Sequence, residues 1–205
     1  MRIRIPTSLL VLFGAVICLA ESPVEPLLGD LRSEIPAVRR QAAAALGRLA
    51  DRAAVPGLLA ALDDPEASVR REAAKSLGDL KDERSVPGLI KTLADRDANV
   101  RFYAAYALGE IKDPQAAEAL VRALGDPQWN VRDQAAWALR ELRQPQIAPR
   151  LVAALQSPQA DFTAVMWLLR QLGPEHALDA AVGLLSAADV RTRLRALQTL
   201  AEIKE

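Results

Sequence analysis

Hydrophobic positions recur along the chain at an interval of about 31 residues. Val-Arg pairs begin at 38, 69, 100 and 131, each 31 residues after the last. A leucine column keeps this interval and continues with steps of 30 and 31: Leu46, Leu77, Leu108, Leu139, Leu169 and Leu200. A fixed period of this length is typical of solenoids. The pattern therefore predicts six repeats.

Each repeat contains two segments with helical periodicity. In residues 85–93, "SVPGLIKTL", Ser85 suits an N-cap and Pro87 the first turn. After a short turn, residues 100–111, "VRFYAAYALGEI", form an apolar stripe with steps of four, four and three. No segment alternates as a strand would. Since one hairpin cannot bury its apolar face alone, we predict an all-α fold, a right-handed α-solenoid of about six stacked helical hairpins.

The last repeat ends in "RTRLRALQTLAEIKE", which carries three arginines in its first five residues. Terminal repeats of a solenoid need a polar outer face to stay soluble. We therefore expect this last helix to cap the array.

The first twenty residues, "MRIRIPTSLLVLFGAVICLA", differ from the repeats. A basic start, an apolar run and small residues at the end are the pattern of a secretory signal peptide, with cleavage near Ala20. The prediction is a signal peptide over 1–20 and a repeat domain over 21–205, located in the periplasm or secreted. An uncleaved membrane anchor is the alternative; a lipoprotein signal is disfavoured because Ile17 precedes Cys18.

Charge and composition offer little support for chemistry. Acidic and basic residues number 26 each, and acids interleave the bases, so no nucleic-acid partner is expected. His176 is the only histidine, and Cys18, the only cysteine, would leave with the signal peptide. One histidine cannot supply a transition-metal site. We expect no catalytic residues, no metal and no cofactor.

The segment "VRREAAKSLGDLKDERSVPGLIKTLADRDANVR" (69–101) resembles the HEAT-repeat family, specifically the short units named from phycobilisome lyase subunits. The resemblance covers about residues 24–205 and implies a helical solenoid. Proteins with such units include lyase subunits, assembly scaffolds and binding modules, so the resemblance says little about function. A bilin-lyase-type enzyme subunit is one alternative, although those members work in the cytoplasm and this chain is expected to be exported.

The resemblance also implies a ladder of arginine and aspartate side chains that joins neighbouring repeats. The matching positions are Arg39, Arg70, Arg101 and Arg132 with Asp64, Asp95 and Asp126. A second recurring set, Gly47, Gly78 and Gly109, indicates close helix packing, because glycine inside a helix costs about 1 kcal/mol relative to alanine. Both sets are expected to be structural.

Aromatic residues gather in the middle of the array. "VRFYAAYALGE" (100–110) repeats the frame of "VRREAAKSLGD" (69–79) but exchanges three charged side chains for rings. Seven of the eight aromatics lie between 102 and 167. On a helical wheel the Lys75 position, followed by Tyr106, Trp137 and Trp167, falls outside the core stripe. The resemblance implies that these second helices line the concave face.

These rings and two nearby arginines are residue types enriched in binding hot spots. The predicted partner-binding set is Phe102, Tyr103, Tyr106, Trp137, Arg140, Trp167 and Arg170. The alternative is that the rings fill gaps in an alanine-rich core, an alternative that applies most to Trp167. We expect a non-catalytic scaffold or adaptor that binds a protein or peptide, as a monomer or in a hetero-complex. It would be tethered to a membrane only if residues 1–20 stay attached.

Overall fold

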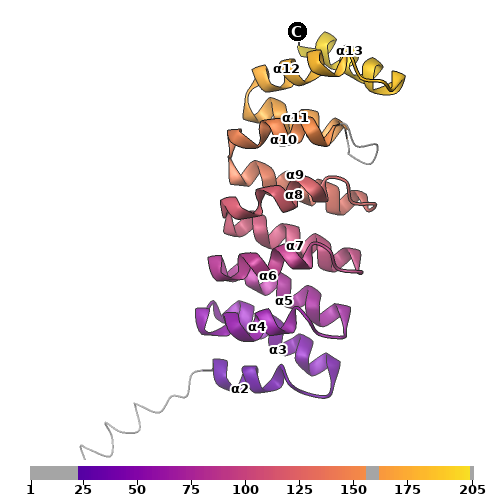
Figure 1. Ribbon diagram of the computed structural model, residues 1–205. Coiled ribbons are helices and arrows are strands. Elements are labelled where there is room, and N and C mark those ends of the chain that lie inside the picture. Colours follow the sequence, from indigo (N-terminus) through magenta and orange to yellow (C-terminus); the bar gives the residue numbers. More distant parts are fainter. Residues whose placement is uncertain (1–22, 156–161, 204–205) are drawn as a thin grey trace, which may run out of the picture.

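The computed structural model describes residues 23–155 and 162–203, which form six consecutive helix pairs stacked along one axis (Figure 1). The leading helices are α2 (Val24–Asp30), α4 (Val55–Ala61), α6 (Val86–Thr92), α8 (Ala117–Ala123), α10 (Ala148–Ala154) and α12 (Pro174–Leu184). The second helices are α3 (Pro36–Leu49), α5 (Ala67–Leu80), α7 (Ala98–Ile111), α9 (Trp129–Leu142), α11 (Phe162–Leu172) and α13 (Val190–Ile203). The predicted all-α solenoid is confirmed. The predicted signal peptide lies outside the described residues.

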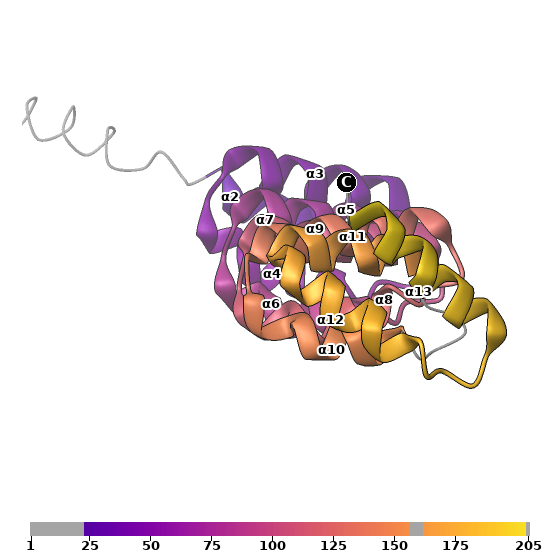
Figure 2. The ribbon, with the colours of Figure 1, turned by 90° about the horizontal axis from the view of Figure 1, so that it is seen from above.

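Leading and second helices form two layers of the stack, as the view along the axis shows (Figure 2). From α3 to α11, each second helix packs on the second helix of the next repeat, and α13 packs on α12. The apolar positions of both layers share one core. The leucine column lies at its centre, with Leu46, Leu77, Leu108, Leu139 and Leu169 fully buried. The 31-residue period is therefore the period of one continuous hydrophobic core.

The start of the leading helix α6 differs from the prediction in the group that caps it. A short 3₁₀ turn, η2 (Glu83–Ser85), precedes α6, and the Ser85 side chain makes no capping hydrogen bond. Instead, the Asp82 carboxylate accepts the backbone N–H of Arg84 at 3.0 Å. Ser85 therefore stands at the predicted N-cap position of α6, but its side chain does not cap the helix. The aspartate three positions earlier orders the entry, as Asp51 and Asp113 do in two other repeats.

The recurring glycines allow second helices to approach each other closely, as predicted. A Cβ atom on Gly78 of α5 would lie 2.7 Å from the Cα of Ala107 on α7. A Cβ on Gly109 of α7 would collide with the ring of Trp137 on α9. Distances below 3.0 Å require one of the helices to move. Glycine is therefore needed here for the space it leaves, and that need outweighs its low helix propensity.

The structure pairs three predicted arginines with three predicted aspartates across successive repeats. The Nε atoms of Arg39, Arg70 and Arg101 lie 2.6, 2.7 and 2.6 Å from a carboxylate oxygen of Asp64, Asp95 and Asp126, respectively. The Nη2 atom of each guanidinium donates to the other oxygen of the same carboxylate, so every pair is bidentate. Each arginine also donates through Nη1 to carbonyls of its own inter-helix loop. One side chain thus ties two loops together.

The fourth predicted arginine makes the same contacts within its own loop. Arg132 Nη1 donates to the carbonyls of Asp126 and Pro127, as its counterparts do in their loops. The position 25 residues further on, where the other three have their aspartate, is Ser157, which lies outside the described residues. Three arginine–aspartate pairs thus join the first four repeats.

The carboxylates of the ladder and of Asp82 should make the stability of the fold sensitive to acid. Burial raises the pKa of Asp95, but the hydrogen bond from Arg70 and the backbone N–H of Asp97 outweigh it, so the pKa lies below its ordinary value. The hydrogen bond from Arg84 is the largest cause that lowers the pKa of Asp82, from 3.8 to about 2. Stabilisation by such groups is complete above the unfolded-state pKa and is lost as the pH falls through the folded-state pKa.

We therefore expect the thermal unfolding midpoint to fall when the pH is lowered from about 4 to about 2. Circular dichroism at a fixed ionic strength measures this midpoint. The Asp82→Asn variant has no carboxylate to protonate at this position, so its midpoint should fall less over the same interval. An unfolding midpoint that does not depend on pH over this range would show that these ionised carboxylates do not stabilise the fold.

The last helix does not form the expected polar cap. Leu194 and Leu197 of α13 are more than half exposed, and so is Val182 of α12. The prediction rested on the arginines of this segment, but α13 presents apolar side chains between them. The C-terminal end of the described stack is an open hydrophobic face.

Candidate functional site

Four of the seven predicted partner-binding residues form a continuous row of ring contacts. Phe102 meets Tyr103 edge-on with centroids 5.2 Å apart, and Tyr103 meets Tyr106 in the same way at 6.3 Å. Tyr106 of α7 stacks on Trp137 of α9, with centroids 5.9 Å apart and planes 13° apart. The row therefore crosses from one repeat to the next. We call the seven predicted residues together the aromatic–arginine surface.

The rings at the start of this surface are supported by the scaffold. Trp137 lies over Gly109 and packs against the core, so it is half-buried. Tyr106 is also half-buried, and its hydroxyl donates to Asp79 at 3.5 Å. Burial, followed by the charge of Asp79, raises the pKa of Tyr106, so its hydroxyl stays protonated at neutral pH. Both rings are therefore held by contacts with the repeats beneath them.

Arg140 stands where the three preceding second helices have glycine. Its guanidinium carbon lies 5.9 Å from the ring centroid of Trp167 on α11, a cation–π contact. Because a long side chain occupies this position, α11 cannot approach α9 as the earlier second helices approach each other. A hollow of about 350 Å³, the first hollow, lies between α9 and α11. It is lined by Asp133, Ala136, Trp137, Arg140, Thr163, Ala164 and Trp167.

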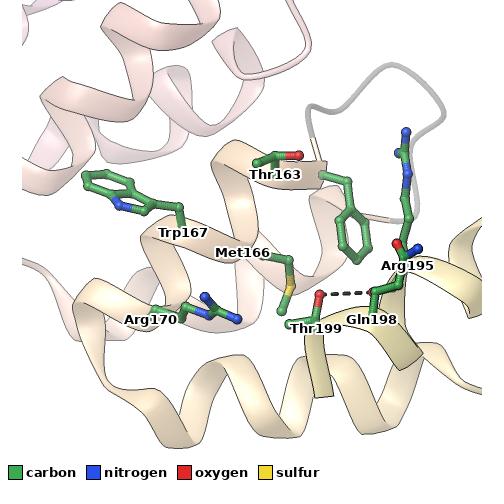
Figure 3. Close-up of a pocket in the computed structure, with 8 residues that line it drawn as sticks. Thr163, Met166, Trp167, Arg170, Arg195, Gln198 and Thr199 are labelled. Carbon is green, nitrogen blue, oxygen red and sulfur yellow. Dashed lines mark hydrogen bonds between the residues drawn. The ribbon is translucent and has the colours of Figure 1, made fainter. Parts of the chain in front are cut away.

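A second hollow, of about 270 Å³, lies between α11 and α13 (Figure 3). Its lining consists of Phe162, Thr163, Met166, Trp167, Arg170, Arg195, Gln198 and Thr199. Met166, Arg170 and Thr199 point toward the same space, and the Thr199 hydroxyl donates to the Arg195 carbonyl at 3.0 Å. Among the side chains that the structure describes, two guanidinium groups and no carboxylate line this hollow, so these groups favour a negatively charged ligand.

Trp167 separates the two hollows and lines both. Its side chain is 40% exposed, although core filling was a stronger alternative for this residue than for the other rings. The structure thus places the rings in two groups: Tyr106 and Trp137 are partly packed into the scaffold, whereas Trp167 is open to solvent. Trp129, at the start of α9, is 66% exposed but lines neither hollow.

Two residues of the second hollow were missed from the sequence. Phe162 stands where the ladder arginine would fall once the fifth repeat is counted as one residue short. Arg195 lies over the Phe162 ring, with its guanidinium carbon 5.6 Å from the centroid. The sequence does indicate Phe162, because an aromatic residue stands there in place of a ladder arginine. The Lys75 column passes through a different face of the helix and therefore does not include Phe162.

The described residues contain no group of three or more His, Cys, Asp or Glu side chains that could hold a metal ion. Within the same part of the chain, no helix is both long enough and apolar enough to cross a bilayer. The assembled side chains can stack on rings, enclose apolar groups and pair with carboxylates. These are the capabilities of a binding surface.

The family comparison agrees with the repeat architecture. The family model for HEAT repeats matches residues 24–98 and 86–167, most of the chain. The protein therefore belongs to the HEAT-repeat family. No curated protein matches the chain.

Solved structures share the architecture over almost the whole chain. Human deoxyhypusine hydroxylase in complex with glycerol is 26% identical, with a TM-score of 0.53, covering 94% of this chain and 76% of that one. A designed armadillo repeat protein in complex with the peptide (KR)4 is 19% identical, with a TM-score of 0.55, covering 90% and 100%. The complex of CpcE and CpcF of phycocyanin lyase from Nostoc sp. PCC7120 is 25% identical, with a TM-score of 0.49, covering 90% and 97%.

Proposed function

We propose that this protein is an exported, non-catalytic HEAT-repeat scaffold that binds an extended segment of a partner protein. The aromatic–arginine surface, together with the two hollows, is the binding site. One observation carries the proposal: Trp167 is a solvent-exposed ring between two hollows, with Arg140 held against its face. A large ring left exposed on a packed scaffold is an expected anchor for a protein partner.

The linings of the two hollows favour different parts of a ligand. Rings and small apolar side chains dominate the first hollow, although Asp133 and Arg140 also reach it. An apolar side chain of the partner fits there. Arg170 and Arg195 line the second hollow, which supports a carboxylate at that position. The favoured segment therefore carries both an apolar and an acidic residue.

The spacing of these two residues follows from the packing of the helices. The hollows lie on either side of α11, and neighbouring packed helices are about 10 Å apart. An extended chain advances about 3.3 Å per residue. The apolar and acidic residues of the ligand should therefore be about three positions apart.

A random peptide library displayed on phage tests this proposal on the purified chain. We expect enrichment of peptides with an apolar residue about three positions from an aspartate or glutamate. Trp167→Ala should weaken their binding at least about tenfold, the size of a hot-spot effect. Arg170→Ala should weaken acidic peptides more than variants of them in which the acid is changed to its amide.

The matched control is Trp129→Ala, which removes an exposed tryptophan that lines neither hollow. Its affinity for the selected peptides should equal that of the unchanged chain. If Trp167→Ala and Trp129→Ala behave alike, the aromatic–arginine surface is not the binding site. Fluorescence anisotropy with labelled peptides gives the dissociation constants.

A further inference from the structure

A third hollow, of about 350 Å³, lies where the C-terminal parts of α9 and α11 meet the turn that follows α9. Its lining consists of Arg140, Glu141, Arg143, Pro145, Leu168, Gln171 and Leu172. Arg140 also lines the first hollow, so the two hollows adjoin. The other six residues line neither of the two hollows described above.

A basic residue follows the second helix in three repeats, each time with a positive φ. These residues are Lys81, Lys112 and Arg143, with φ of 50°, 61° and 50°. The Nζ atom of Lys81 lies 2.6 Å from a carboxylate oxygen of Glu110 on the next second helix. Lys112 pairs in the same way with Glu141, at 2.7 Å. In two repeats, therefore, this cation receives a glutamate from the second helix that follows.

Arg143 is offered an amide instead of a carboxylate. Two positions after the leucine column, where the two preceding second helices carry Glu110 and Glu141, α11 carries Gln171. Within residues 23–155 and 162–203, no carboxylate forms an ion pair with Arg143, and its side chain is exposed. The described part of the chain thus keeps the cation of this arrangement but replaces the anion by a neutral side chain.

Glu141 brings a negative charge to the lining, but two other cations already hold it. Lys112 Nζ lies 2.7 Å from one of its carboxylate oxygens, and Arg140 Nη2 lies 3.1 Å from the other. The charge of Glu141 is therefore balanced at its own end of the hollow. Among the described residues, the charge of Arg143 is not balanced in this way.

Apolar side chains border the same space. Leu168 is buried and Leu172 is half-buried, and Pro145 begins the short turn η4 (Pro145–Ile147). A guanidinium beside an aliphatic wall suits a carboxylate that is carried on methylene groups. The carboxylate pairs with the guanidinium, and the methylene groups cover apolar surface. A glutamate side chain has this composition.

We propose that the third hollow binds a glutamate side chain of a partner protein. This glutamate pairs with Arg143, as the chain's own glutamates pair with the basic residue in the two preceding repeats. The choice of a protein as the source of the carboxylate rests on the proposed function, because Arg140 joins this hollow to the surface that binds the partner. Gln171 leaves the site available, since a glutamate there would pair with Arg143 within the chain.

Titration of the isotope-labelled full chain with Nα-acetylglutamate methylamide, followed by NMR, tests the site without any selected peptide. We expect saturable shifts of the Arg143 Nε–H and Gln171 side-chain amide resonances. The glutamine counterpart of the probe should bind at least about threefold more weakly, because it cannot form the ion pair. Gln171→Glu should weaken binding of the glutamate probe by a similar factor, because the chain's own carboxylate then occupies Arg143.

Two further variants show whether the effect is local. Arg143→Ala should abolish the difference between the glutamate and glutamine probes. Arg150→Ala removes an exposed arginine of α10 that lines none of the three hollows, so it should leave both affinities unchanged. Equal binding of the two probes to the unchanged chain, or a preference for glutamate that survives Arg143→Ala, would overturn the proposal.

The peptides selected on the aromatic–arginine surface show whether the glutamate belongs to the partner. When these peptides are extended by randomised residues, glutamate or aspartate should be enriched in the extension on the unchanged chain but not on Arg143→Ala. Binding that depends on Trp167 but never on Arg143 would leave the proposed function intact and exclude the third hollow as a partner site. Binding that depends on Arg143 but not on Trp167 would support the third hollow and refute the proposed function. If no peptide is selected, the proposed function fails, and the NMR titration alone decides whether the third hollow binds glutamate.

Discussion

Asp95→Ala is expected to lower the free energy of unfolding by about 3 kcal/mol, measured by urea titration. Arg70 is only 5% exposed, and its guanidinium is held by Asp95 through two hydrogen bonds of 2.7 and 2.8 Å. Removal of the carboxylate leaves a buried positive charge with only loop carbonyls as acceptors. The variant also loses the hydrogen bond from Asp97 N–H that orders the loop.

The matched control is Asp63→Ala. Asp63 also pairs with the next repeat, through Lys91 Nζ at 2.9 Å, but both side chains are more than 70% exposed. Exposed pairs contribute little because water screens them, so we expect a loss below about 0.5 kcal/mol. Equal losses for Asp63→Ala and Asp95→Ala would show that the buried ladder does not hold neighbouring repeats together.

Gly78→Leu is expected to destabilise the fold by about 3 kcal/mol or more, measured in the same way. Already the first added carbon would lie 2.7 Å from the Ala107 backbone, and the rest of the side chain has no room between α5 and α7. The clash outweighs the roughly 1 kcal/mol that leucine gains over glycine in helix propensity. The two helices must separate, which opens the core around Leu77 and Leu108.

Gly183→Ala in α12 provides the opposite case. A Cβ at Gly183 meets nothing within 4 Å, so only helix propensity changes. We expect this variant to be as stable as the unchanged chain or more stable, by up to about 1 kcal/mol. Gly78→Ala should be less stable than the unchanged chain. If both alanine variants are stabilised, the recurring glycines are not required for close packing.

The repeat period predicted the helix pairs and the ladder positions because both depend on spacing along the chain. Arg39, Arg70 and Arg101 find their aspartates 25 residues on, a distance fixed by one helical hairpin. The Lys75 column likewise located Tyr106, Trp137 and Trp167 on one face. Features that recur at a constant interval could thus be predicted from the sequence.

Features that depend on a break in the 31-residue period could not be predicted from the sequence. Whether a ring is buried depends on the gap between two helices, and that gap widens where Arg140 replaces a glycine. The second hollow involves Phe162 and Arg195, which lie on helices of two different repeats, and their contact could not be foreseen from the spacing of one column. The polar appearance of the last segment concealed Leu194 and Leu197, because arginines alternate with leucines along this part of α13.

The central claim is that Trp167 is an exposed anchor on which a ligand lies. The most direct measurement is acrylamide quenching of its fluorescence in the Trp129→Phe/Trp137→Phe variant, where it is the only tryptophan. We predict red-shifted emission that acrylamide quenches readily, and protection from quenching when a selected peptide is bound. Blue-shifted emission that resists quenching in the absence of peptide would contradict the account, because the ring would then belong to the core.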